Sequence, residues 1–251
     1  MRAPAEPAAA SWQLAWPSQP LVGISGTRLG RGTGASLEFL DSREYVPGDD
    51  LRAVDWRAYA RSDQLRVRLF REEVAPVLDV IVDVSPSMAV TEVKAAAAAD
   101  LRAAFVWWGE RGGARARVYE IAGPGAPVGL RRGGVRVLVS DLLVPDDPGP
   151  LLARLAAGAA LLVVVQLLDP AELQPEPDGP VALIDCETGA RLEIVLDAPA
   201  VARYRERLDR LIAGVAAAAR RTAARHATVC AAPLDAMCRS ALLPAGIVTV
   251  A

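Results

Sequence analysis

Histidine and cysteine are scarce in this chain. Its 251 residues include one histidine, His226, and three cysteines that are widely spaced and form no Cys-x-x-Cys pair: Cys186, Cys230 and Cys238. This pattern indicates neither a zinc site nor a disulfide framework. We expect the three cysteines to be ordinary reduced and partly buried thiols.

The chain also lacks a long hydrophobic run. The longest apolar stretch, residues 155–168, is shorter than the roughly 20 residues that a membrane span needs. Prolines interrupt the amino-terminal residues, whereas a signal peptide would be continuous and apolar there. A net charge of −2 gives no general attraction to nucleic acid or to an anionic membrane. The sequence therefore predicts a cytoplasmic globular protein with no nucleic-acid partner and no direct membrane insertion.

Composition divides the chain into three regions. Residues 1–20, rich in alanine and proline, are expected to be a poorly ordered lead-in. Residues 21–75 begin with a glycine-rich stretch and continue with a dense mixture of arginines, carboxylates and aromatic residues. No Gly-Lys-Ser/Thr follows the glycines, which excludes a P-loop. Residues 76–251 alternate apolar runs with helical patterns and are expected to form the main domain.

Regular elements are expected from residue 77 on. Apolar runs predict strands at 77–83, 116–121, 135–139, 160–167 and 227–231, the last strand of the chain. Two hairpins are predicted, one between 116–121 and 128–130 and one between 181–184 and 191–196. Helices are predicted at about 91–108, 148–157 and 201–222. The expected buried face of the first helix carries Val93, Ala97, Leu101, Ala104 and Trp108. This alternation is typical of an α/β fold with a mostly parallel central sheet and helices on both faces.

Polar side chains follow two of the expected strands. Asp83, Ser85 and Ser87 come at alternate positions at the end of strand 77–83, and Asp141 follows strand 135–139. The carboxyl ends of parallel strands meet at one edge of a sheet, where open α/β sheets place their ligand sites. Carboxylate and hydroxyl oxygens suit Mg²⁺, and an ion held by only two carboxylates stays open to a carboxylate from another protein. The alternative interpretation is that these side chains only cap the following helix and turn.

Enzymatic interpretations fit less well. An aspartyl-phosphate transferase needs a second aspartate two residues after the first, and Ser85 stands there. A serine hydrolase needs a Gly-x-Ser-x-Gly motif, which is absent, and a histidine base, whereas His226 stands beside Arg225 at an expected helix end. A metal-dependent phosphohydrolase is a further alternative, because two carboxylates and a metal can activate water.

Two patterns resemble known families. Asp83-x-Ser85-x-Ser87 with Ser140-Asp141 resembles the metal-ion-dependent adhesion site of von Willebrand factor A domains. Residues 43–61 resemble the hallmark of the bacterial family called domain of unknown function 58. The hallmark positions are Arg43, Tyr45, Gly48, Asp49, Arg52, Asp55, Trp56 and Arg61. Further matches at 32–39, 169–172 and 185–189 extend the resemblance from about residue 21 to near the end.

The resemblance implies a Rossmann-like von Willebrand factor A fold, preceded by a charged loop and strand elaboration, without enzymatic activity. Family members are often encoded beside MoxR-type AAA+ ATPases and are thought to act with them in assembling or maturing other proteins. The expected partner is therefore such an ATPase or its client. The alternative is a metal-independent scaffold that binds through the charged segment 43–61. Within that segment, Asp49 and Asp55 are expected to accept hydrogen bonds from Arg43, Arg52 or Arg61, with Trp56 packed beneath.

The chain departs from the family pattern in two ways. Family members commonly carry amino-terminal membrane spans, and this sequence shows none, so membrane attachment is not carried over. Von Willebrand factor A domains also add a threonine from another loop to the metal shell. The only threonine between Asp83 and Asp141 is Thr91, which is expected inside the first helix. The magnesium ion is then weakly held or lost, or recruits Thr27 or Thr33 from the glycine-rich stretch.

Overall fold

The structure is a computed structural model that describes residues 9–17, 37–72, 76–123, 125–144 and 146–251. The chain divides into two compact units, one made of residues 1–21 with 76–251 and the other of residues 22–75. We call them the main unit and the small unit and describe each by itself. In the described ranges, no helix combines the length and the apolar character needed to cross a membrane.

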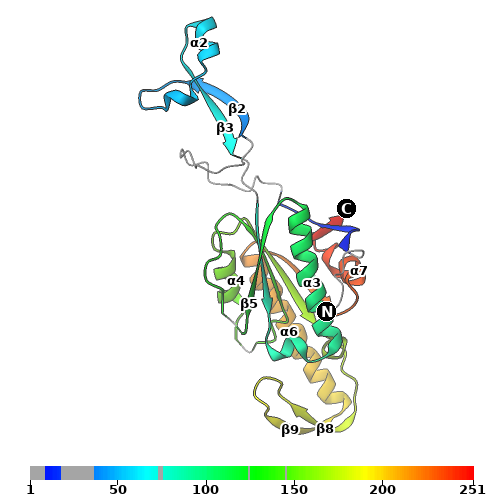
Figure 1. Cartoon of the computed structure of the whole chain (residues 1–251). Coiled ribbons are helices and arrows are strands. Elements are labelled where there is room, and N and C mark those ends of the chain that lie inside the picture. Colours follow the sequence, from blue (N-terminus) through cyan, green and yellow to red (C-terminus); the bar gives the residue numbers. More distant parts are fainter. Residues whose placement is uncertain (1–8, 18–36, 73–75, 124, 145) are drawn as a thin grey trace. The chain divides into compact units, whose positions relative to one another are not determined.

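A five-stranded parallel sheet forms the centre of the main unit (Figure 1). Its spatial order is β10-β7-β6-β4-β5. The strands are β4 (Val77–Asp83), β5 (Arg115–Ile121), β6 (Val135–Ser140), β7 (Leu161–Leu168) and β10 (Arg225–Cys230). The strands β4, β6 and β7 are almost entirely buried, which is why they appear in the sequence as continuous apolar runs. The prediction of these five strands is confirmed, with bounds that differ by at most two residues.

Helices cover both faces of the sheet. One face packs against α3 (Glu92–Arg111), which follows the 3-10 helix η2 (Pro86–Ala89), and against α7 (Leu234–Met237) and the π-helical turn η3 (Cys238–Leu242). The other face packs against α4 (Gly149–Ala156) and α6 (Ala198–Arg221). The three predicted helices are confirmed, and the architecture is compatible with a Rossmann-like fold.

The amino-terminal turn of α3 differs from the prediction. Val93 is half-exposed, at 52%, whereas Lys94 is fully buried, at 0%. The predicted buried face is therefore wrong at its first position, because ion pairs hold the lysine inward. Thr91 is not inside the helix either: it is the N-cap, and its hydroxyl accepts the Lys94 backbone N–H at 3.1 Å.

A short antiparallel ribbon pairs β1 (Trp12–Leu14) with β11 (Val248–Val250). Trp12 is 2% exposed, its Nε1 donates to Asp235 Oδ1 at 3.0 Å, and the Arg239 guanidinium lies over its ring. The prediction of residues 1–20 as a poorly ordered lead-in therefore does not hold for residues 12–14, and β10 is not the last strand. Burial of the Trp12 indole fastens this segment to the core.

One of the two predicted hairpins is present. β8 (Gly179–Ile184) pairs with β9 (Arg191–Leu196) after the short helix α5 (Pro170–Leu173), as expected. The hairpin between 116–121 and 128–130 is wrong. Val128 is 95% exposed and Gly129 has a φ of +85°, so the chain turns where a returning strand was expected. Among the described strands, β5 pairs only with β4.

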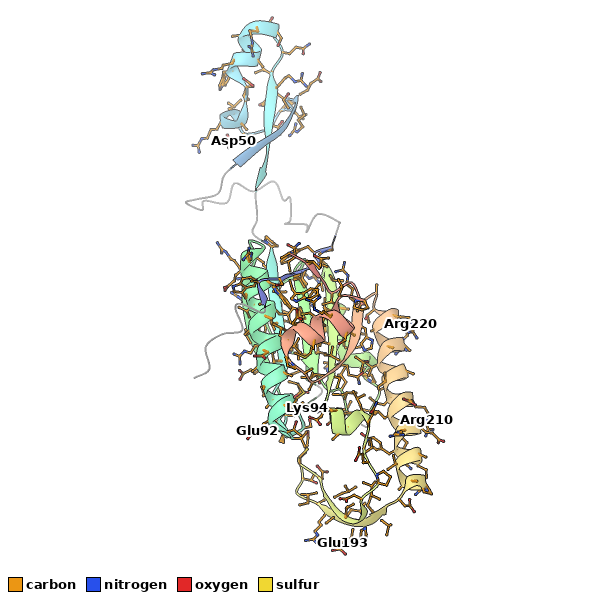
Figure 2. All side chains as sticks on the ribbon, turned by 90° about the vertical axis from the view of Figure 1, so that its right-hand side faces the viewer. Asp50, Glu92, Lys94, Glu193, Arg210 and Arg220 are labelled. Atoms are coloured by element: carbon orange, nitrogen blue, oxygen red, sulfur yellow. The ribbon has the colours of Figure 1, made fainter. Side chains whose placement is uncertain are left out.

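The small unit is an antiparallel hairpin with a helical connection. β2 (Leu37–Glu44) pairs with β3 (Arg66–Glu72), and between them lie the 3-10 helix η1 (Leu51–Ala53) and the helix α2 (Trp56–Ser62). The side chains of Asp50, labelled in Figure 2, and Asp55 cap these two helices. Two aspartates thus cap the starts of both described helices of this unit.

Candidate functional site

The candidate site lies where the chain changes direction across the sheet. From β4 the chain continues to β5 on one side and then to β6 on the other, so β4 and β6 flank a topological switch point. Ligand sites of open α/β sheets lie at the carboxyl ends of the strands at such points. Asp83 ends β4 and Ser140 ends β6, which places the two predicted motifs at this edge.

The Asp-x-Ser-x-Ser motif forms a hydrogen-bonded group. Asp83 Oδ1 accepts the Ser85 backbone N–H at 2.9 Å, and Asp83 Oδ2 accepts the Ser140 hydroxyl at 2.7 Å. The Ser85 and Ser87 hydroxyl oxygens are hydrogen-bonded at 2.9 Å. Asp83 and Ser85 are 8% and 6% exposed. The structure thus brings together the three predicted residues of β4 and its following turn, with Ser140 as an additional member.

Asp141 is held by a lysine that the sequence patterns did not single out. Lys94 Nζ donates to Asp141 Oδ2 at 2.9 Å and to Glu172 Oε1 at 2.8 Å. Both Lys94 and Asp141 are buried, and Asp141 Oδ1 accepts the Leu143 backbone N–H at 3.1 Å. Figure 2 shows Lys94 and Glu92 at the end of the main unit from which the hairpin bearing Glu193 extends. One signal was available: Lys94 is the only lysine among 28 basic residues.

The segment after β7 adds further contacts to Thr91 and Lys94. The Thr91 hydroxyl donates to Asp169 Oδ2 at 2.5 Å, and Asp169 and Glu172 form a capping box at the start of α5. Glu172 therefore contacts both Lys94, through Oε1, and the Asp169 backbone N–H, through Oε2 at 2.6 Å. The Tyr204 hydroxyl donates to the Glu172 carbonyl at 2.8 Å and ties this segment to α6.

The donor set fits a divalent metal only in part. Adjacent ligands of an octahedral Mg²⁺ lie about 3.0 Å apart, and the 2.9 Å between the Ser85 and Ser87 hydroxyls matches that spacing. Asp141, however, already has its charge compensated by Lys94, which leaves Asp83 as the one uncompensated carboxylate of the motif. The described ranges hold no group of three or more His, Cys, Asp or Glu residues placed to bind a metal. Thr27 and Thr33 lie outside the described residues. These contacts do not fit a tightly held divalent ion.

Exposed apolar side chains and a mostly apolar cavity adjoin this polar group. Val84, Val90 and Val93 are 49%, 51% and 52% exposed, and all three belong to the turn after β4 or the start of α3. A cavity of about 660 Å³ has Asp83 and Ser85 in its wall. Most of its lining is apolar and comes from α3 and the neighbouring strands, including Ala98, Ala99, Val106, Trp107 and Val118.

The other titratable candidates lie apart from this group. His226 is in β10 and not at a helix end as expected. It lies near the amino end of that strand, at the sheet edge opposite Asp83. Burial, together with the Arg220 charge, lowers the pKa of His226. The three cysteines are free, but Cys186 and Cys230 are exposed, so the prediction of partly buried thiols is wrong for these two. Burial raises the pKa of Cys238 to about 12.

Comparison with known proteins identifies the family. The family model described as "Protein of unknown function DUF58" matches residues 41–124 and 126–214. The chain belongs to the DUF58 family. Uncharacterized protein Mb1516 of Mycobacterium bovis and uncharacterized protein Rv1480 of Mycobacterium tuberculosis are each 30% identical to it over 260 residues, covering 86% of this chain and 79% of the relative. No solved structure matches the chain. The matched DUF58 region contains both the Asp83 group and Glu172.

The DUF58 hallmark lies in the small unit. Arg43 donates to both carboxylate oxygens of Asp49, at 2.8 and 2.6 Å, as expected, and this contact lowers the pKa of Asp49. Gly48 has a φ of +111°, a backbone conformation that only glycine adopts readily, and this explains why glycine occupies the position. The Tyr45 backbone N–H donates to the Leu65 carbonyl, and Arg52 and Arg61 are exposed.

Trp56 differs from the prediction that it packs beneath the charged residues of the hallmark. It is 55% exposed and meets only the edge of Tyr59 among the aromatic rings of the described residues, with the ring centroids 6.3 Å apart. The physical reason is that Trp56 begins α2, a short helix that has no buried residue. The hallmark therefore presents an aromatic surface in addition to its ion pair.

Proposed function

We propose that this DUF58 chain is a non-enzymatic protein-interaction module of the von Willebrand factor A type. In this proposal it works in the cytoplasm with a MoxR-type AAA+ ATPase in the assembly or maturation of a client protein. The partner binds at the carboxyl edge of the sheet, over the ends of β4 and β6.

One observation carries the proposal: a buried group of carboxylate and hydroxyl side chains lies in the same turn and helix start as three half-exposed valines. Asp83 and Ser85 are nearly buried, while Val84 between them is 49% exposed. Contiguous apolar surface around a few oriented polar groups is typical of sites that bind another protein. The adjoining cavity of about 660 Å³ gives the same edge room for apolar side chains of a partner.

The same contacts support a role without catalysis. The Ser85 hydroxyl is hydrogen-bonded to Ser87, and the only histidine of the chain lies at the other end of the sheet. A phosphohydrolase would need a metal to activate water, and Asp141 is paired with Lys94. Activity toward a panel of phosphoesters that is lost in Asp141→Ala would contradict this part of the proposal.

Capture of the AAA+ ATPase by the purified chain tests the proposal. We expect Asp83→Ala and Ser85→Ala each to lower capture at least tenfold, because they remove the central polar group of the interface. Glu206→Ala, an exposed change on α6, is the matched control and should leave capture unchanged. Circular dichroism establishes that each variant is folded. Unchanged capture by folded Asp83→Ala and Ser85→Ala would remove this edge from the interaction.

A second candidate is a scaffold that binds its partner through segment 43–61 of the small unit. Trp56, Leu51 and Val46 support it, because they are 55%, 57% and 57% exposed beside the Arg43–Asp49 ion pair. Trp56→Ala distinguishes the two candidates. Loss of capture in Trp56→Ala together with full capture by Asp83→Ala would favour the scaffold.

A further inference from the structure

Lys94 is the only lysine of a chain that otherwise uses arginine for its positive side chains. Its side chain is 0% exposed, and the interior of a protein is where a charged side chain is least expected. Burying a charged side chain costs free energy unless it is closely paired. Lys94 must therefore be closely paired, and the geometry of its partners limits which cation can occupy this position.

The geometry around Lys94 explains why that cation is an ammonium. Its Nζ contacts Asp141 Oδ2 at 2.9 Å and Glu172 Oε1 at 2.8 Å, two carboxylates that come from different sides of the site. An ammonium is a compact charge whose three donors can point to separate acceptors, whereas a guanidinium is a flat fork suited to one carboxylate. The contacts of Lys94 thus resemble those of a small metal ion more than those of the chain's surface arginines.

The carboxylates at Lys94 are oriented independently of it. Asp141 Oδ1 accepts the Leu143 backbone N–H, and Glu172 Oε2 accepts the Asp169 backbone N–H. The second oxygen of each is therefore presented to a common point, which the ammonium fills. Without the ammonium, two carboxylates that are largely buried would face each other with no compensating charge.

We infer that Lys94 is a resident cation, which supplies at Asp141 the positive charge that a divalent metal would otherwise supply. Binding at this edge of the sheet then needs no magnesium. The inference concerns the charge at Asp141 and is tested without a partner, so it can fail while the proposed function holds, and the reverse.

Calorimetric titration with MgCl₂ and MnCl₂ tests the inference on the full chain. We expect the wild type to show no binding below millimolar concentrations. Lys94→Met, which removes the charge and keeps much of the side-chain volume, should bind Mn²⁺ at least tenfold more tightly than the wild type. In Lys94→Met/Asp141→Asn this gain should disappear, because the acquired ion would use the freed carboxylate. A folded Lys94→Met with no gain would overturn the inference.

If Lys94→Met does not fold, measurements on the wild type and on Asp141→Asn test the inference instead. The thermal unfolding midpoint of the wild type should be the same in EDTA and in MgCl₂ whose concentration is raised in 5-fold to 10-fold steps. The midpoint of Asp141→Asn should likewise not depend on the metal. Submillimolar magnesium binding by the wild type that Asp141→Asn abolishes would show a metal, and not Lys94, at Asp141. Recovery of folded Lys94→Met on addition of Mn²⁺ would support the resident cation.

Discussion

Arg136 is a second buried cation, and its contacts show how this fold compensates a buried charge. It is 2% exposed in β6, and its guanidinium donates to the carbonyl oxygens of Leu155 and Ala157, at the end of α4, and of Arg131. A cation at a helix carboxyl end is favourable because it compensates the unpaired carbonyls. Asp79 lies beside Arg136 on β4, is 0% exposed, and has its pKa raised by burial.

Arg136→Met should lower the free energy of unfolding by about 3–5 kcal/mol, since it leaves buried carbonyls unpaired and Asp79 with less compensating charge. Urea denaturation measures the change. Arg132→Met, at an exposed position just before β6, is the control and should stay within about 0.5 kcal/mol of the wild type. A loss in Arg136→Met no larger than the control's would show that the buried contacts do not stabilise the fold.

The β1–β11 ribbon is the element that the sequence patterns concealed most completely. It contains three residues per strand, and the side chains of Trp12, Leu14 and Val248 are buried in the core on the face of the sheet that carries α3. Trp12 and Leu14 are buried, and Gln13 between them is exposed. Trp12 is the largest of these side chains and also donates a hydrogen bond to Asp235, so we expect it to contribute most to the stability that the ribbon adds.

Trp12→Ala should cost about 3–5 kcal/mol of unfolding free energy, the usual range for deleting a buried tryptophan side chain. Gln13→Ala, on the exposed face of the same strand, is the matched control. Chemical denaturation of both variants decides the matter. Equal midpoints for the two would mean that β1 is not fastened to the core through Trp12.

Elements with a strong local signal could be predicted, and those set by distant contacts could not. β4, β6 and β7 are continuous apolar runs, and the placement of Asp83, Ser85 and Ser87 follows from the end of β4 in a parallel sheet. The inward direction of Lys94 depends on Asp141 and Glu172, which are 47 and 78 residues away. Likewise, a three-residue strand such as β1 is too short to show a hydrophobic period, and its partner β11 is far from it along the sequence.

For the molecule as a whole, pH acts on stability through separate groups. His226 is the only histidine, and its pKa is lowered first by burial and then by Arg220. The folded state therefore favours the neutral imidazole, and the unfolded state takes up the proton first. The pKa of Asp235 is lowered by Arg239 and Trp12, so its contribution is present above its unfolded pKa and lost as pH falls through its folded pKa.

Lowering the pH from 7 to 5 should therefore reduce the unfolding midpoint of the wild type, because it passes the unfolded histidine pKa of about 6.5. His226→Gln should be nearly flat in that range, and both proteins should lose stability below about pH 4 as the paired aspartates take up protons. Thermal unfolding followed by circular dichroism measures both curves. An equally steep decline in His226→Gln between pH 7 and 5 would assign the effect to other groups.

The pairing of Trp12 with Val250 also has a consequence for biosynthesis. The strand that pairs with the backbone of residue 12 is synthesised more than 230 residues after it. At about 5–20 residues per second, Trp12 waits on the order of 10–50 s for its partner. During that time the large indole lacks the finished surface that covers it in the folded unit, so this part of the nascent chain is exposed to chaperones and to premature association.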